Sequence, residues 1–197
     1  MQWIPWRFFI RGILDDLHFH EVVDELRDFD ERFRLILRKH LAVLGWWCLL
    51  NGVSALLGLF LLGGGWWYFV LMNANWAIIN FLVVLWIYHH IIARQFADGN
   101  TYQRFEGQRH VEKMLLLNIG LDLAYIFAGL FLWTLGRVPD TLHVDLWRGF
   151  GASVILQGTF LFIHDNVFYR LHRINFRKAR AYLESVLHRD HQPMGMA

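Results

Sequence analysis

The sequence predicts an all-α integral membrane protein, an up-down-up-down bundle of four helices. Three observations lead to this fold class: the composition, the presence of long apolar runs, and the placement of the basic residues. Of the 197 residues, 56% are hydrophobic, whereas a soluble domain usually contains about 45–50%. The excess is gathered in blocks, as is typical of membrane-spanning segments.

Four apolar runs are long enough to cross a bilayer, because a hydrocarbon core of about 30 Å requires about 20 helical residues. None of the four contains a Lys or Arg. The triplet Gly63-Gly64-Gly65 makes the first hairpin tight, so the first two spans are expected to be antiparallel neighbours. Together residues 41–169 form the predicted transmembrane bundle, with spans at Leu41–Leu62, Trp66–Tyr88, Met114–Gly136 and Gly149–Tyr169.

The basic residues predict the orientation of the spans. Seven of the 19 Lys and Arg residues precede the first span, four lie between the second and third spans, and six follow the fourth. Only Arg137 and Arg148 fall on the other side. Because cytoplasmic loops are enriched in Lys and Arg, both termini are expected to be cytoplasmic.

Residues 1–40 are expected to form a cytoplasmic segment that includes an amphipathic helix. A narrow apolar seam, with spacings of 3 and 4 residues, follows one face of this helix. Its members are Phe19, Val22, Leu26, Phe29, Phe33 and Ile36. The seam packs either on the cytoplasmic parts of its own bundle, or on a partner subunit or a second copy of the chain.

Residues 170–197 are expected to form a basic cytoplasmic helix and tail. The arginines and the lysine of this segment follow the fourth span directly. Such a juxtamembrane cluster is typical of a contact with anionic lipid. The lipid bilayer is therefore the expected partner, and nucleic acid is not.

Two carboxylates inside the spans indicate a candidate site. Of the 17 acidic residues, only Asp122 and Asp165 lie within predicted spans. An ionisable side chain at the bilayer centre costs about 3 kcal/mol on insertion scales, so both are expected to face the bundle interior. No Lys or Arg within a span can neutralise them. Each is therefore protonated, held by neutral donors, paired with a flanking His or Arg, or in contact with water or a bound cation.

Other polar side chains lie at matching depths on the predicted helices. With a rise of about 1.5 Å per residue, Asp122 and Asn80 are both about 12 Å from the cytoplasmic end of their spans, and Asp165 is about half as deep. The predicted ligand-binding set is Asp122, Asp165, Asn118, Asn80, Tyr125, Gln157, His164 and His172.

This set has two interpretations. The first is a hydrogen-bonded network that fixes the register of the helices in lipid. The second is a site, open to the cytoplasm, that binds or passes a small ligand, a proton or a cation. The two acids favour the second interpretation, because intramembrane carboxylates usually mark ion, proton or substrate sites.

Two other classes of protein compete with this one. A non-enzymatic accessory or scaffold subunit would recruit its partner through the apolar seam. A metal-dependent or haem-dependent membrane enzyme would need ligands, and only Glu106 and His110 have a helical spacing that suits a metal. The weak candidates for metal ligands are His89, His90, Glu106 and His110. No enzyme motif is present, so the sequence favours a protein that is not an enzyme and assigns no cofactor.

Three segments of the chain share a pattern with a known group of proteins: MNANWAIIN at 72–80, LLLNIGLDLAYIFAGL at 115–130 and QGTFLFIHDNVFYRLHRIN at 157–175. They resemble a family of small bacterial four-span membrane proteins of unknown function, with the motifs N-x-G-L-D-x-x-Y-x-x-x-G and Q-G-x-F-L-x-x-x-D. The matching residues are Asn118, Gly120, Asp122, Tyr125, Gly129, Gln157, Gly158, Asp165 and Asn175. The resemblance implies a location in the bacterial cytoplasmic membrane and implies no activity.

Overall fold

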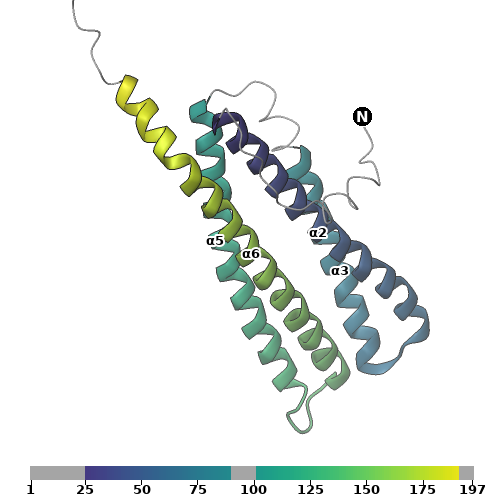
Figure 1. The fold of residues 1–197 in the computed structure, drawn as a ribbon. Coiled ribbons are helices and arrows are strands. Elements are labelled where there is room, and N and C mark those ends of the chain that lie inside the picture. The colour runs from purple at the N-terminus through teal and green to yellow at the C-terminus, as the bar shows by residue number, and fades with distance from the viewer. Residues whose placement is uncertain (1–24, 90–100, 191–197) are drawn as a thin grey trace, which may run out of the picture.

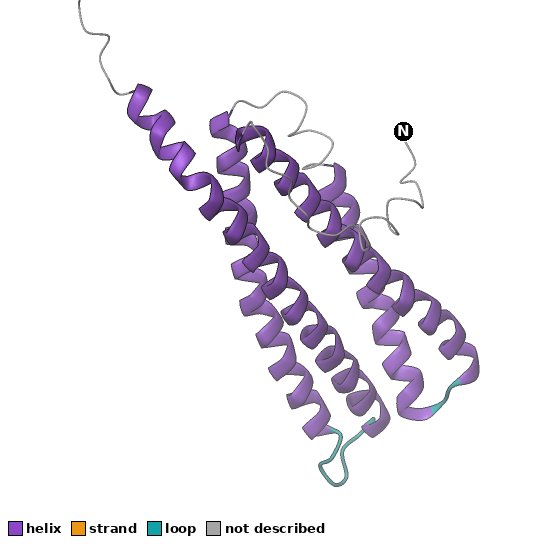
Figure 2. Ribbon diagram, in the orientation of Figure 1, coloured by secondary structure: helices purple, strands orange, loops and turns teal. Residues whose placement is uncertain are grey.

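A computed structural model describes residues 25–89 and 101–190 of the protein. Within these ranges it contains helices and no strand (Figure 2). The helices are α2 (Glu25–Leu61), α3 (Gly64–Ile87), α5 (Thr101–Leu135) and α6 (Val144–Asp190). The prediction of an all-α four-helix bundle is confirmed.

The four helices form two antiparallel hairpins, α2–α3 and α5–α6, whose turns lie at the same end of the molecule (Figure 1). This end is called the turn end below, and the opposite end is called the distal end. Only two residues separate α2 from α3, so the glycine triplet makes the tight hairpin that the sequence predicts. Gly64 has φ of 57°, a left-handed conformation that glycine adopts without a steric penalty.

Each helix is long and apolar enough to cross a membrane. Large apolar side chains cover the outside of the bundle, and Phe60 and Leu61 are 84% and 79% exposed. Such a surface is suited to contact with lipid. The 47 residues of α6 span about 70 Å at 1.5 Å per residue, so α6 is much longer than a hydrocarbon core of about 30 Å requires.

The helices extend beyond the predicted spans at the distal end. Helix α2 joins the predicted amphipathic segment to the first span without a break from Glu25. Helix α5 begins at Thr101, well before the predicted third span at Met114. The segment 101–113 contains no Pro and several good helix formers, such as Gln, Arg, Glu and Lys.

The core of the distal half lies where α2, α5 and α6 meet. Phe29 and Phe33 of the apolar seam are each only 1% exposed, and Ile36 is 4% exposed. Phe29 stacks on Phe105 of α5, with ring centroids 4.5 Å apart. The described part of the seam thus packs on its own bundle, while Phe19, Val22 and the side chain of Leu26 lie outside the described residues. One cluster of the core consists of Phe33, Ile36, Leu37, Val111, Leu115 and Phe168.

Helix α6 contacts each of the other three helices, and its contact with α5 is the most extensive. Gly129 of α5 and Gly151 of α6 allow this close approach. A Cβ atom on Gly129 would lie 2.9 Å from the carbonyl oxygen of Gly151, and one on Gly151 would lie 2.8 Å from that of Gly129. Any side chain at these positions would therefore push α5 and α6 apart.

Candidate functional site

Helix α6 carries a series of buried polar side chains that runs along the interior of the bundle. All six are at most 5% exposed: Ser153, Gln157, His164, Asp165, His172 and Asn175. From the turn end to the distal end, they take part in three polar groups. We call these groups the amide layer, the His–Asp cluster and the distal cluster.

The amide layer joins α2, α3 and α6 through the side chains of Trp47, Asn51, Asn73, Ser153 and Gln157. The amide nitrogen of Gln157 donates to Oδ1 of Asn51 at 2.9 Å and to Oδ1 of Asn73 at 2.8 Å. Its oxygen accepts a bond from the indole of Trp47 at 2.7 Å. The hydroxyl of Ser153 also donates to Asn73, at 2.8 Å. Within the described ranges, no buried polar atom of these side chains lacks a partner, so the layer fits a structural network.

The distal cluster joins α2, α5 and α6 through Arg32, Gln108, Glu112 and Asn175. Nε of Arg32 donates to Oδ1 of Asn175 at 2.6 Å. The amide of Asn175 donates to Oε1 of Gln108 at 3.2 Å, and the amide of Gln108 donates to the backbone oxygen of His172 at 2.7 Å. The ring of His172 is fully buried against Phe33, and neither of its nitrogens has a partner among the described residues.

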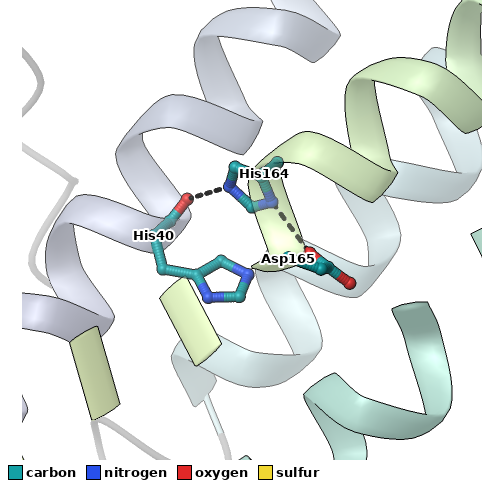
Figure 3. A group of neighbouring side chains, drawn as sticks. All are labelled: His40, His164 and Asp165. Carbon is teal, nitrogen blue, oxygen red and sulfur yellow. Dashed lines mark hydrogen bonds and ion pairs between the residues drawn. The ribbon is translucent and has the colours of Figure 1, made fainter. Parts of the chain in front are cut away.

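The His–Asp cluster lies between these two groups and consists of His40 from α2 with His164 and Asp165 from α6. All three residues are buried, with exposures of 8%, 5% and 5%. One ligand atom of each lies within 4.8 Å of those of the other two. Figure 3 shows the ring of His40 turned toward Asp165, with His164 above them.

Both ring nitrogens of His164 face an oxygen that only accepts. Nδ1 lies 2.9 Å from Oδ1 of Asp165, and Nε2 lies 3.3 Å from the backbone oxygen of His40. A neutral imidazole carries one N–H, so it can donate to one of these oxygens at a time, and a protonated ring can donate to both. The shorter contact favours Nδ1 as the donor to Asp165 in the neutral ring.

The ring of His40 is held by aromatic contacts. It stands edge-on to His164, with ring centroids 4.5 Å apart and an interplanar angle of 88°. Phe168 packs against it at 4.7 Å. In the part of the chain that the structure describes, Nδ1 of His40 is buried without a hydrogen-bond partner. Nδ1 of His40 is therefore available to bind a ligand or a metal ion.

Two further members of the predicted set are also buried. Asp122 of α5 is 3% exposed, and its carboxylate is within electrostatic reach of Asp165. Asn80 of α3 is 6% exposed. Oδ2 of Asp122 and Nδ2 of Asn80 both lack a partner among the described residues. Asp122 thus adds a second carboxylate to the interior without joining the three convergent ligands.

Asn118 and Tyr125 of the predicted set do not lie in the buried interior. Asn118 is half-buried, and Tyr125 is 36% exposed and packs edge-on against Trp76 at 5.1 Å. The cause is that α5 packs mainly on α6, so its buried face is narrow. Asp122 occupies that face, while Asn118 lies at its edge and Tyr125 turns outward.

The weak metal candidates of the sequence are not part of the His–Asp cluster. His89, Glu106 and His110 are exposed, and His90 lies outside the described residues. Sequence reasoning missed His40, which precedes the first predicted span. A signal for it exists, because Phe29, Phe33, Ile36 and His40 continue one helical spacing of 4, 3 and 4 residues. His40 therefore lies on the buried face of the seam.

Four apolar helices around a buried polar interior define the class of the molecule, an integral membrane protein of the four-helix type. Residues 43–166, more than half of the chain, match the family of unknown function DUF6992, and the chain belongs to this family. The expectation of an uncharacterised family is confirmed to that extent. Neither curated proteins nor solved structures give a match. The matched range includes Asp122, His164 and Asp165, and it begins after His40.

Proposed function

We propose that this protein binds a small cation in the interior of its bundle, at His40, His164 and Asp165. The observation that carries the proposal is the convergence of two imidazoles and one carboxylate from two helices, with ligand atoms within 4.8 Å of one another. The protein would lie in a bacterial cytoplasmic membrane. The 17-to-2 distribution of its basic residues supports an orientation with the distal end and both termini in the cytoplasm.

The charges of the interior favour a cation over an anion or a neutral ligand. Asp165 and Asp122 are both buried and within electrostatic reach of each other. None of the four predicted spans contains a Lys or Arg. Two carboxylates in a medium of low dielectric constant create a strong negative potential when they ionise. A bound cation would balance that charge.

The unused polar atoms favour a binding site over a purely structural network. The amide layer satisfies its buried polar atoms internally, whereas Nδ1 of His40 and Oδ2 of Asp122 have no partner within the described ranges. A buried polar atom without a partner costs about 1–3 kcal/mol. A cation at the His–Asp cluster would supply a partner to the ring of His40.

Binding is better supported than passage through the membrane. Toward the turn end, the closed amide layer follows the His–Asp cluster, and Gln157 at its centre is 0% exposed. Its hydrogen bonds to Asn51 and Asn73 would have to break before a cation could pass from the His–Asp cluster to the turn end. We therefore propose a site that is entered and left from the cytoplasmic side.

The apolar seam is not assigned to a partner subunit. Phe29, Phe33 and Ile36 are buried in the bundle, so a partner that used them would first have to displace α5 and α6.

Thermal unfolding in mild detergent tests the proposal. The protein is stripped of bound ions and then titrated separately with monovalent and divalent cations. At least one cation is expected to raise the unfolding temperature, because a ligand at 100 times its Kd stabilises by about 2.7 kcal/mol. Asp165→Asn is expected to abolish this effect, and Asp122→Asn to weaken it.

Asp145→Asn is the matched control, since Asp145 is an exposed carboxylate of the same helix. It is expected to respond to cations as the unaltered protein does. If no cation shifts the unfolding temperature, or if Asp165→Asn keeps the full shift, the proposed function is wrong.

A further inference from the structure

We propose that the cation is a first-row transition-metal dication of the class of Zn²⁺, ligated by His40, His164 and Asp165 with one coordination position left open. This inference rests on the proposed function and adds the chemical class of the ligand. It assigns a metal site to residues that the sequence did not connect, since His40 belongs to α2 and the other two residues belong to α6.

The donor set determines the class of metal. Mg²⁺ and Ca²⁺ take oxygen ligands almost exclusively, whereas imidazole nitrogens suit Zn²⁺, Fe²⁺, Co²⁺ and related ions. The cluster offers nitrogen from His40 and His164 and oxygen from Asp165. Two imidazoles and a carboxylate therefore indicate a transition metal rather than an alkaline-earth ion.

His164 already has the outer contact that is usual for a metal ligand. A ligating histidine almost always donates its second ring N–H to a carboxylate, a backbone carbonyl or water, which fixes its orientation. Nε2 of His164 lies 3.3 Å from the backbone oxygen of His40 and would donate to it when Nδ1 binds a metal. Nδ1 lies 2.9 Å from Oδ1 of Asp165. A metal ion at these two atoms would replace their hydrogen bond with two bonds to the metal.

His40 closes the site from the opposite helix. Its ring is turned toward Asp165 (Figure 3), and its ligand atom lies within 4.8 Å of those of His164 and Asp165. Adjacent ligands of a tetrahedral ion with bonds of about 2.0–2.1 Å are about 3.3–3.4 Å apart. Binding one ion would therefore move Nδ1 of His164 and Oδ1 of Asp165, which are 2.9 Å apart, slightly away from each other. It would also draw the ring of His40 closer to them.

The number of ligands indicates a site with an open position. A structural zinc site has four protein ligands, whereas a site with three keeps a place for water or a further ligand. Within the described ranges, the convergent group has three members. Phe160 and Phe168 flank His164, with ring centroids 5.7 Å and 4.9 Å away. These rings surround the site with apolar atoms and limit the motion of the imidazole.

A shared proton is the competing occupant of the contact between His164 and Asp165. A proton satisfies those two atoms, but it gives no role to the ring of His40, which is buried and has an unpartnered nitrogen among the described residues. A metal ion uses all three side chains at once. The two occupants give different results in a metal titration.

The test is a titration of the purified, ion-free protein in detergent with Co²⁺, followed by competition with Zn²⁺. One Co²⁺ per chain is expected to bind with the visible absorption bands of a four-coordinate nitrogen and oxygen site, and Zn²⁺ is expected to remove these bands. His40→Ala, His164→Ala and Asp165→Asn are each expected to weaken Co²⁺ binding at least tenfold. His40→Gln replaces the imidazole with a side chain of similar size in case the alanine variant does not fold.

His110→Ala is the control, because His110 is an exposed histidine outside the cluster and reports binding to the protein surface. It is expected to leave Co²⁺ affinity and absorption unchanged. The inference is overturned if the unaltered protein binds no Co²⁺ or Zn²⁺, or if the cluster variants bind as it does. The proposed function survives that result if another cation still stabilises the protein through Asp165, and it fails too if none does.

Discussion

Gln157 is the single side chain that ties three helices together in the amide layer. Its amide group bonds to Asn51 and Trp47 of α2 and to Asn73 of α3. It is fully buried, so water cannot replace these bonds if the side chain is removed. The stability of the bundle should therefore depend on Gln157 more than on any apolar neighbour of similar size that faces lipid.

Gln157→Leu is expected to destabilise the protein by about 1–3 kcal/mol, because it leaves buried polar partners unsatisfied. The measurement is the free energy of unfolding in mixed detergent. Leu156→Ala is the control, since Leu156 is 39% exposed on the same helix, and it should change this free energy less. Equal stability of Gln157→Leu and the unaltered protein would show that the amide layer does not hold the helices together.

At the scale of the element, the contact between α5 and α6 depends on the absence of side chains at Gly129 and Gly151. Gly129→Ala is expected to destabilise the protein, because the added Cβ would lie 2.8 Å from the backbone nitrogen of Ile155 and 2.9 Å from the backbone oxygen of Gly151. Overpacking of this kind costs about 1–3 kcal/mol. The unfolding temperature in detergent measures the effect.

Gly120→Ala provides the comparison within the same helix, because a Cβ on Gly120 meets no atom within 4 Å. It should leave the unfolding temperature unchanged or raise it slightly, since alanine has the higher helix propensity. If both alanine variants are equally stable, the close approach of α5 and α6 is not a feature of the folded protein.

The distal part of α2 is held to α6 by polar contacts as well as by the aromatic core. Asn175 accepts from Arg32 and donates to the backbone oxygen of Phe29. Asn175→Ala is expected to leave the buried Arg32 with one partner fewer, and hydrogen bonds to charged groups contribute about 1.5–3 kcal/mol. Hydrogen exchange of the amides in residues 25–37 should become faster, while exchange in α3 should not change.

Ile174→Ala serves as the control for Asn175→Ala, because Ile174 is the preceding residue and is 43% exposed. Its exchange pattern should match that of the unaltered protein. Unchanged protection of residues 25–37 in Asn175→Ala would mean that the aromatic contacts alone fix the distal part of α2.

At the scale of the whole molecule, the proposed orientation has a direct consequence for chemical labelling. In a Cys48→Ala background, Leu142→Cys lies in the turn between α5 and α6, where Leu142 is 79% exposed. Arg180→Cys lies at an exposed position of α6 near the distal end. A membrane-impermeant maleimide is expected to label Leu142→Cys in intact bacterial cells and Arg180→Cys only after permeabilisation. The reverse pattern would contradict the orientation that the basic residues predict.

The sequence predicts the architecture well because lipid imposes strong constraints. An apolar run that crosses lipid must be helical, because its backbone N–H and C=O groups have no other hydrogen-bond partners there. The glycine triplet in turn predicts a tight turn between the first two helices. The bounds of α5 were less predictable, because the polar segment from Thr101 is compatible with either a loop or a helix. Only packing on Phe29 and the rest of the distal core selects the helix.

The site could be predicted in part, for similar reasons. The energetic penalty of an ionisable group in lipid correctly predicts that Asp122 and Asp165 are buried. It does not predict the position of Tyr125, which is not charged and whose exposure depends on the width of the buried face of α5. The contact between His164 and Asp165 depends on the conformations of their side chains. The approach of His40 to both residues depends on how α2 crosses α6. Helical spacing in the sequence predicts neither the side-chain conformations nor the crossing.

The most direct test of the central claim is a side-chain-resolution density map of the Zn²⁺-loaded protein, with anomalous scattering measured at the zinc edge. The account predicts one anomalous peak at bonding distance from Asp165, His164 and His40, at about 2.0–2.2 Å from each ligand atom. A map without a peak there, in which His164 and Asp165 remain in direct hydrogen-bond contact at saturating Zn²⁺, would contradict it.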